Sequence, residues 1–269
     1  YLALSYCWGT QNTLKSHLQL NKSTLAELKT SINTNKIAIT LQEALRATYT
    51  LRYRFIWIDA LCIIQGDEND WQTESASISR IYASATITLV PAAIESCDEG
   101  FLDRTIPPLL LVSFRSSHRP DLTGNFYLQA TNADTHITEW NKRGWTFQEL
   151  LESRRLLYFS KTMLHYSCQT VVRVESREEA TSATEGFYTP WAWTHKELGV
   201  SAWFGAVREY SGRLLSNPSD KLPAISARAH DIAAQSQSQY LAGLWRDSLV
   251  LGLLWYCVDP QVDKYDSDT

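Results

Sequence analysis

The side chains best suited to chemistry in this sequence are two carboxylates and a short turn rich in polar and aromatic residues. Glu149 lies four residues after Trp145, and Asp59 ends an apolar run. The turn contains Ser5, Tyr6, Trp8 and Gly9. A carboxylate between apolar walls stabilises positive charge that develops during a reaction, and aromatic faces stack on planar ligands. These residue types predict a site in which a carboxylate faces a bound ligand.

The spacing of cysteines and histidines does not favour metal or thiol chemistry. The five cysteines form no C-x-x-C pair, and the six histidines form no i, i+4 pair. We therefore predict neither a metal site nor a bound cofactor. Cys7 and Cys62 lie in apolar segments with no adjacent histidine, so a thiol nucleophile is not expected. An odd number of widely spaced cysteines is typical of buried thiols in a reduced, cytoplasmic compartment.

Composition and charge exclude two classes of partner. The formal net charge is -4, and the sequence contains no run of five or more basic residues that could contact a phosphate backbone. Nucleic acid is therefore not an expected partner. The longest apolar stretches fall short of the ~20 residues that span a bilayer, so no membrane segment is expected. Because the chain starts at Tyr1 inside an expected strand, we interpret the sequence as a piece of a longer protein.

The segments that position these residues alternate between strand and helix. Apolar, β-branched or aromatic runs predict strands at residues 2–7, 54–59, 86–91 and 155–159. Helical spacing predicts helices at 40–51, 71–85 and 143–154. Thr40 followed by Glu43 predicts a capping box at the first of these helices. The order predicts an α/β fold with a mainly parallel sheet, whose ligands lie at the carboxyl ends of the strands.

The rest of the chain is expected to add a hairpin and a tail. Residues 109–114 and 125–129 predict an insertion hairpin, and residues 164–174 a further strand. A polar linker is expected at 175–186. Helices are expected at 191–215, at 221–234 with Asp220 as its cap, and at 241–257. We therefore predict an α/β domain over residues 1–174, with a linker and a helical extension over 175–269 packed on it.

Four ordered motifs resemble the fungal heterokaryon-incompatibility (HET) domain. They are YLALSYCWG at residues 1–9, FIWIDALCIIQ at 55–65, the Asp70, Trp71, Glu74, Ile81, Tyr82 set, and RGWTFQELL at 143–151 continuing into RRLLYF at 154–159. The resemblance implies a cytoplasmic fungal protein that acts in non-self recognition and programmed cell death. It also implies partners in the form of recognition domains on the same or another chain.

The sequence is more distantly similar to Toll/interleukin-1 receptor (TIR) domains, several of which cleave NAD. Those flavodoxin-like domains open with a strand ending in Ser-Tyr and carry a Trp-x-x-x-Glu helix, as Ser5-Tyr6 and Trp145 to Glu149 do here. The resemblance implies NAD as substrate and Glu149 as the catalytic carboxylate. Nicotinamide leaves from a cationic pyridinium, so the barrier is dominated by positive charge growing on the ribose, which a carboxylate stabilises.

The similarity implies ligand contacts for the neighbouring residues, each of which also has a structural interpretation. Ser5, Tyr6, Trp8 and Trp145 could line the site or pack in the core, and Gly9 could serve only the turn. Arg143 is a further expected ligand contact, and Asp59 could bind ribose hydroxyls or pair with Arg143, since a buried carboxylate needs a partner. Glu149 itself could be a surface or capping carboxylate, and Glu74 either a second acid or a helix-surface residue.

Two functions of different classes follow. The domain either hydrolyses the nicotinamide–ribose bond of NAD, or acts as a non-enzymatic death-signalling adaptor through self-association. An enzyme requires Glu149 beside the turn at residues 5–9, in a concave pocket. An adaptor requires only exposed complementary surfaces.

Overall fold

The main sheet of this protein has seven strands among the residues that its computed structural model describes, which are 1–9, 13, 17–104, 110–128, 138–175, 181–182, 200–236 and 238–255. The strand order is β2-β1-β3-β6-β7-β8-β9. The pairs from β2 to β6 are parallel and those from β6 to β9 antiparallel. The strands are β1 (Leu2–Leu4), β2 (Ile56–Trp57), β3 (Ile87–Val90), β6 (Arg155–Phe159), β7 (Leu164–Cys168), β8 (Val171–Val174) and β9 (Thr181–Ser182).

This topology confirms the predicted α/β class with a parallel sheet. The four parallel strands have β1 between β2 and β3, which is the order of flavodoxin-like sheets. The likeness to TIR domains stays a prediction. The single strand expected at 164–174 is wrong, because the chain reverses at Gln169 and Thr170 and β7 pairs antiparallel with β8.

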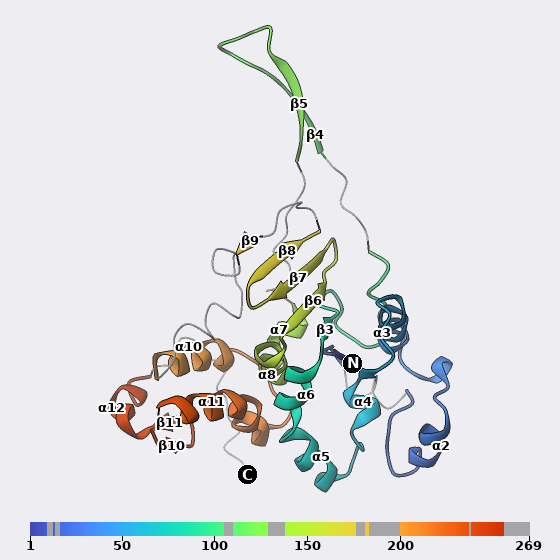
Figure 1. Cartoon of the computed structure of the whole chain (residues 1–269), viewed down its shortest axis with the longest axis vertical. Helices are drawn as coiled ribbons and strands as arrows, with labels where there is room; N and C mark the ends of the chain where they lie inside the picture. The colour runs from blue at the N-terminus through green and yellow to red at the C-terminus, as the bar shows by residue number, and fades with distance from the viewer. Residues whose placement is uncertain are drawn as a thin grey trace.

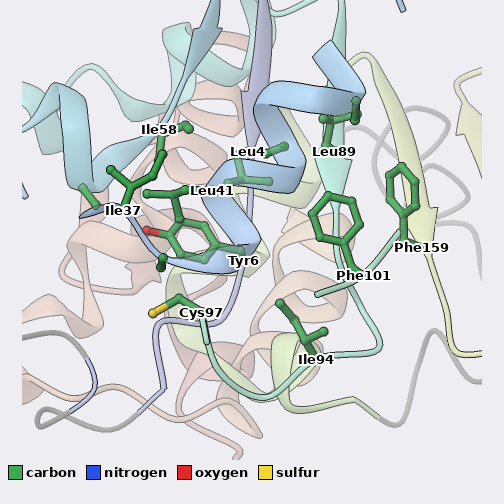
Figure 2. Close-up of a cluster of buried hydrophobic side chains, with 14 of the residues drawn as sticks. Leu4, Tyr6, Ile37, Leu41, Ile58, Leu89, Ile94, Cys97, Phe101 and Phe159 are labelled. Atoms are coloured by element: carbon green, nitrogen blue, oxygen red, sulfur yellow. The ribbon is translucent and has the colours of Figure 1, made fainter. Parts of the chain in front are cut away.

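Helices cover both faces of the parallel strands (Figure 1). Leu2, Leu4 and Leu89 pack with helix α3 on one face, whereas Ala3 packs with helix α6 on the other. This alternation is the period of two that a strand buried on both faces requires. Figure 2 shows the larger cluster, in which Leu4, Leu41 and Phe101 meet. The helices before the tail are α2 (Leu25–Thr30), η1 (Thr34–Lys36), α3 (Ile39–Thr50), α4 (Asp59–Cys62), α5 (Glu68–Ser75), α6 (Ile78–Ser84), α7 (Glu139–Lys142) and α8 (Gly144–Glu152).

The capping box expected at Thr40 is wrong. Helix α3 begins at Ile39 after Ala38, and the Thr40 hydroxyl donates to the Glu99 carbonyl at 2.6 Å. The Glu43 carboxylate accepts from the backbone N–H groups of Phe101 and Leu102. Both side chains therefore hold the loop that follows β3 instead of closing their own helix.

Two further boundaries differ from the sequence prediction. The strand expected at 54–59 is only Ile56–Trp57, and Asp59 is the first residue of α4. The helix expected at 71–85 is two helices, because a turn at 76–77 separates α5 from α6. Helix α5 begins earlier than expected, where Asp67 caps it by accepting from the Asn69 and Asp70 N–H groups. The insertion hairpin is confirmed: β4 (Leu110–Arg115) pairs antiparallel with β5 (Thr123–Leu128) and projects from the body (Figure 1).

The tail was expected to be all-helical, but it also contains two short strands. Ala242 and Gly243 both have positive φ, the conformation of a two-residue type I′ turn, and they join two short strands where a helix was predicted. The predicted cap at Asp220 is also wrong, because the helix there begins only at Ser226, and Asp220 lies in the preceding 3-10 helix, where it accepts from Trp145. Residues 191–199 and 256–257 of the expected helices lie outside the described residues. The tail elements are α10 (Val200–Ser211), η2 (Pro218–Lys221), η3 (Pro223–Ile225), α11 (Ser226–Ser236), β10 (Tyr240–Leu241), β11 (Leu244–Trp245), η4 (Arg246–Ser248) and α12 (Leu249–Gly252).

The described part of the tail packs on helix α8. Phe147 of α8 shares a buried cluster with Trp203, Ile225 and Trp245, and Figure 1 shows α10 and α11 beside α8. The boundary at residue 174 stays a prediction. No described helix is long and apolar enough to cross a membrane.

Candidate functional site

The predicted site residues Ser5, Tyr6, Trp8 and Gly9 follow the carboxyl end of β1. Ser5 follows β1, and its N–H donates to the Leu89 carbonyl of β3 at 3.0 Å. The chain runs from β1 to β2 on one side and then returns across β1 to β3 on the other, which makes this the topological switch point of the parallel strands. Ligands of open α/β sheets bind in the crevice at such points.

Ser5 and Glu149 are in direct contact, although 144 residues separate them. The Ser5 hydroxyl donates to Glu149 Oε2, and Trp140 Nε1 donates to Ser5 Oγ at 2.7 Å. Because the indole N–H can only donate, Ser5 Oγ accepts from it and directs its own proton to the carboxylate. Trp140 of α7 and Ser5 are both buried, so this chain of hydrogen bonds fixes where the Glu149 carboxylate lies.

Glu149 as a whole residue is partly exposed, but protein surrounds its carboxyl group. Burial raises the pKa of this carboxyl to about 7, and the negative charge of Asp59 adds to the rise. The Arg143 guanidinium and the Ser5 hydrogen bond oppose it. Near neutral pH the group therefore exists in both protonation states, which is the property of carboxylates that act in catalysis.

Asp59 forms the second half of the site. Trp8 Nε1 donates to Asp59 Oδ2 at 2.7 Å, and the Ala60 N–H donates to Oδ1 at 2.7 Å. Burial raises the pKa of Asp59, against the lowering effect of the Arg143 charge. Arg143 itself donates to the Tyr6 carbonyl, so one guanidinium lies near both carboxylates. Asp59 thus has structural partners, and a role toward ribose stays a prediction.

The two aromatic residues of the turn differ in exposure. Tyr6 is buried within the core cluster, whereas Trp8 is partly exposed. Their rings stack with centroids 6.3 Å apart and an interplanar angle of 25°. Of these two, Trp8 has the ring face that a planar ligand could reach.

Gly9 has two independent reasons to be glycine. Its φ is +85°, and a Cβ atom there would lie 3.3 Å from Ser96 Cα and 2.7 Å from Ser96 Oγ. Gly66 has a similar φ of +79° but no atom within 4 Å of its would-be Cβ.

We expect Gly9→Ala to lower the free energy of unfolding by about 2–4 kcal/mol, the sum of left-handed strain and a steric clash. Gly66→Ala carries the strain alone and should cost only about 1–2 kcal/mol. Urea unfolding of both variants measures the difference. Equal losses would contradict a role for the Ser96 contact.

Trp145 faces the tail. Its Nε1 donates to Asp220 Oδ2 at 2.9 Å, and its ring meets Trp71 edge-on at 5.5 Å between centroids. These contacts account for the residue as a core anchor between α5, α8 and the tail. A ligand contact for Trp145 stays a prediction.

Sequence reasoning missed two residues at the site. Trp140 supports Ser5, and the buried Tyr82 hydroxyl donates to the Leu4 carbonyl at 3.0 Å while also facing Glu149. Tyr82 belonged to one of the quoted motifs, so its motif position was an available signal. Trp140 lies outside those motifs, and only the fold brings it beside Ser5.

Comparison with known families gives one match. A family model described as heterokaryon incompatibility protein (HET) matches residues 1–149, which is more than half of the 269-residue chain. The resemblance expected from the sequence motifs is therefore confirmed over those residues. No curated protein and no solved structure matches the chain.

Proposed function

Because this chain belongs to the heterokaryon incompatibility (HET) family, we propose that it is an effector of non-self recognition and programmed cell death that acts in the cytoplasm by hydrolysing the nicotinamide–ribose bond of NAD. The observation that carries this proposal is the contact of Glu149 with Ser5 at the switch point of the sheet. That contact puts Glu149 beside the turn at residues 5–9, which is one of the two features that an enzyme requires.

The proposed reaction needs a negative charge beside the ribose and a water molecule. The bond between ribose C1′ and the pyridinium nitrogen breaks, and its electron pair neutralises the departing nicotinamide. The Glu149 carboxylate stabilises the oxocarbenium-like ribose, and water adds to C1′ with release of a proton, giving ADP-ribose. Ser5 and Trp140 hold the carboxylate in place, and Trp8 offers a ring face for stacking.

An assay of the purified chain with NAD tests the proposal. Nicotinamide and ADP-ribose should form in equal amounts when the protein is incubated alone, under crowding, or after forced oligomerisation. Light scattering of the same samples follows self-association. Self-association without NAD cleavage under all three conditions would reject the enzyme and favour the second candidate, the adaptor. The exposed apolar side chains of the β4–β5 hairpin support this second candidate.

The pH dependence of this activity should follow Glu149. Only its ionised form stabilises a cation, so kcat/KM should rise with pH through a midpoint near 7, the pKa of this carboxyl. Since the Asp59 charge raises that pKa, Asp59→Asn should move the rise to lower pH. Initial rates from pH 5 to 9 measure both midpoints. A midpoint that stays fixed or moves upward in Asp59→Asn would contradict this assignment.

A further inference from the structure

A cluster of three potential metal ligands lies next to the candidate site. His17 Nε2 is hydrogen-bonded to Asp98 Oδ1, although 81 residues separate them in sequence. One ligand atom each from His17, Cys97 and Asp98 lies within 4.8 Å of the other two. Figure 2 shows Cys97 beside Tyr6 at the edge of the core. The sequence prediction of no metal site considered only spacing along the chain, which cannot register ligands brought together by folding.

Backbone contacts hold both segments of this cluster in place. The Leu18 N–H donates to the Lys36 carbonyl at 2.9 Å, next to His17. On the other side, the Cys97 carbonyl accepts from the Thr40 N–H at 3.0 Å. Glu99 Oε1 accepts from the N–H groups of Glu95 and Ser96 at 3.0 and 2.9 Å, which closes the loop that carries Cys97 and Asp98. The three ligand groups are therefore arranged before any ion binds.

We propose that His17, Cys97 and Asp98 bind a divalent transition metal of the zinc class. Imidazole nitrogen, thiolate and carboxylate are the ligands that Zn²⁺ takes in proteins. Tetrahedral coordination places such ligand atoms about 3.3–3.8 Å apart, so adjustments of about an ångström would suffice. Mg²⁺ and Ca²⁺ prefer sets of oxygen ligands and do not suit a thiol and an imidazole. Three protein ligands leave the fourth position for water.

Binding requires the loss of protons from the cluster. The Cys97 side chain is buried, and its thiol must lose its proton to bind a metal as thiolate. The metal replaces the thiol proton, and the hydrogen bond between His17 and Asp98 gives way to two metal–ligand bonds. Metal affinity should therefore increase with pH.

The position of the cluster suggests what the metal does. Ser96, the neighbour of Cys97, lies against Gly9, which ends the turn of the candidate site. His17 follows that turn by eight positions in sequence. A metal bound to His17, Cys97 and Asp98 would tie His17 to the loop whose Ser96 lies against Gly9. The proposed metal is thus a structural clamp beside the site, and its binding does not depend on NAD cleavage.

Titration of the purified full chain with Co²⁺ and Zn²⁺ tests the proposal. We expect one Co²⁺ per chain with a thiolate-to-cobalt charge-transfer band, displacement by Zn²⁺, and a higher Tm with Zn²⁺. Cys97→Ser should lose the band. Since Cys97 is buried and its variant could unfold, His17→Ala, at a partly exposed position, is the second variant. It should bind at least about 100-fold more weakly, as the loss of a second-shell partner alone costs 10–100-fold.

Two matched variants serve as controls. Cys62→Ser and His230→Ala remove an exposed cysteine and an exposed histidine elsewhere, and both should keep the band and the Tm increase. The proposal is overturned if the unmodified chain shows no charge-transfer band. It is also overturned if folded His17→Ala binds Co²⁺ as tightly as the unmodified chain, or if Cys62→Ser abolishes the band.

Discussion

Glu149→Gln is expected to lower kcat/KM for NAD cleavage by at least about 10³-fold, which corresponds to about 4 kcal/mol of lost transition-state stabilisation. The amide keeps the size of the carboxyl and can still accept from Ser5, so the change removes charge and little else. The protein should fold normally. Above pH 7 it should even gain stability, because burial raises the pKa of Glu149 and so makes its ionised form unfavourable in the folded state.

Glu152→Gln provides a control on the same helix. Burial raises the pKa of Glu152 to about 7 as well, but Glu152 accepts from Ser79 at 3.1 Å and lies near Arg228 of the tail. It should change kcat/KM by less than about threefold while sharing any stabilisation above pH 7. Nicotinamide release and thermal unfolding of both variants separate the two effects. Full activity in Glu149→Gln would remove this residue from the proposed mechanism, and equal losses in both variants would indicate a general structural effect.

The approach of Glu149 to Ser5 is what the resemblance to TIR domains implies, since those domains combine a strand ending in Ser-Tyr with a Trp-x-x-x-Glu helix. Strand order by itself predicts only that Ser5 lies at the carboxyl edge of the parallel strands. The contribution of Trp140 could not be anticipated in this way. It depends on the turn between α7 and α8, where the Thr146 hydroxyl donates to the Trp140 carbonyl at 2.8 Å. Tertiary contacts of this kind leave no period in the sequence.

The errors in the fold prediction have a common physical origin. Thr40 and Glu43 have the spacing of a capping box, but their side chains satisfy backbone groups of the loop at 99–102, which outweighs local capping. The segment at 241–257 is apolar enough for a helix, yet Ala242 and Gly243 adopt positive φ and turn the chain. In each case a partner remote in sequence or a turn conformation outweighed the local pattern and determined the structure.

The same dependence on remote contacts makes Arg213 a side chain whose loss should strongly destabilise the fold. It follows α10, and only 3% of its side chain is exposed. Nη1 donates to Thr146 Oγ1 at 3.0 Å and Nη2 to Asn141 Oδ1 at 2.7 Å. The guanidinium also lies over the Phe147 ring, 5.2 Å from its centroid. Arg213 therefore ties the tail to the turn that carries Trp140 and to helix α8.

Arg213→Ala should lower the free energy of unfolding by about 3–5 kcal/mol, because it removes a buried, multiply bonded charge and leaves a cavity between the tail and α8. Arg208→Ala, at an exposed position on α10, is the matched control and should cost no more than about 0.5 kcal/mol. Urea unfolding followed by tryptophan fluorescence measures both. A loss below about 1 kcal/mol in Arg213→Ala would mean that the tail rests on α8 through its apolar cluster alone. A loss of the expected size would mean that the stability of the fold depends on a residue of the tail, some 60 positions beyond the end of the family match.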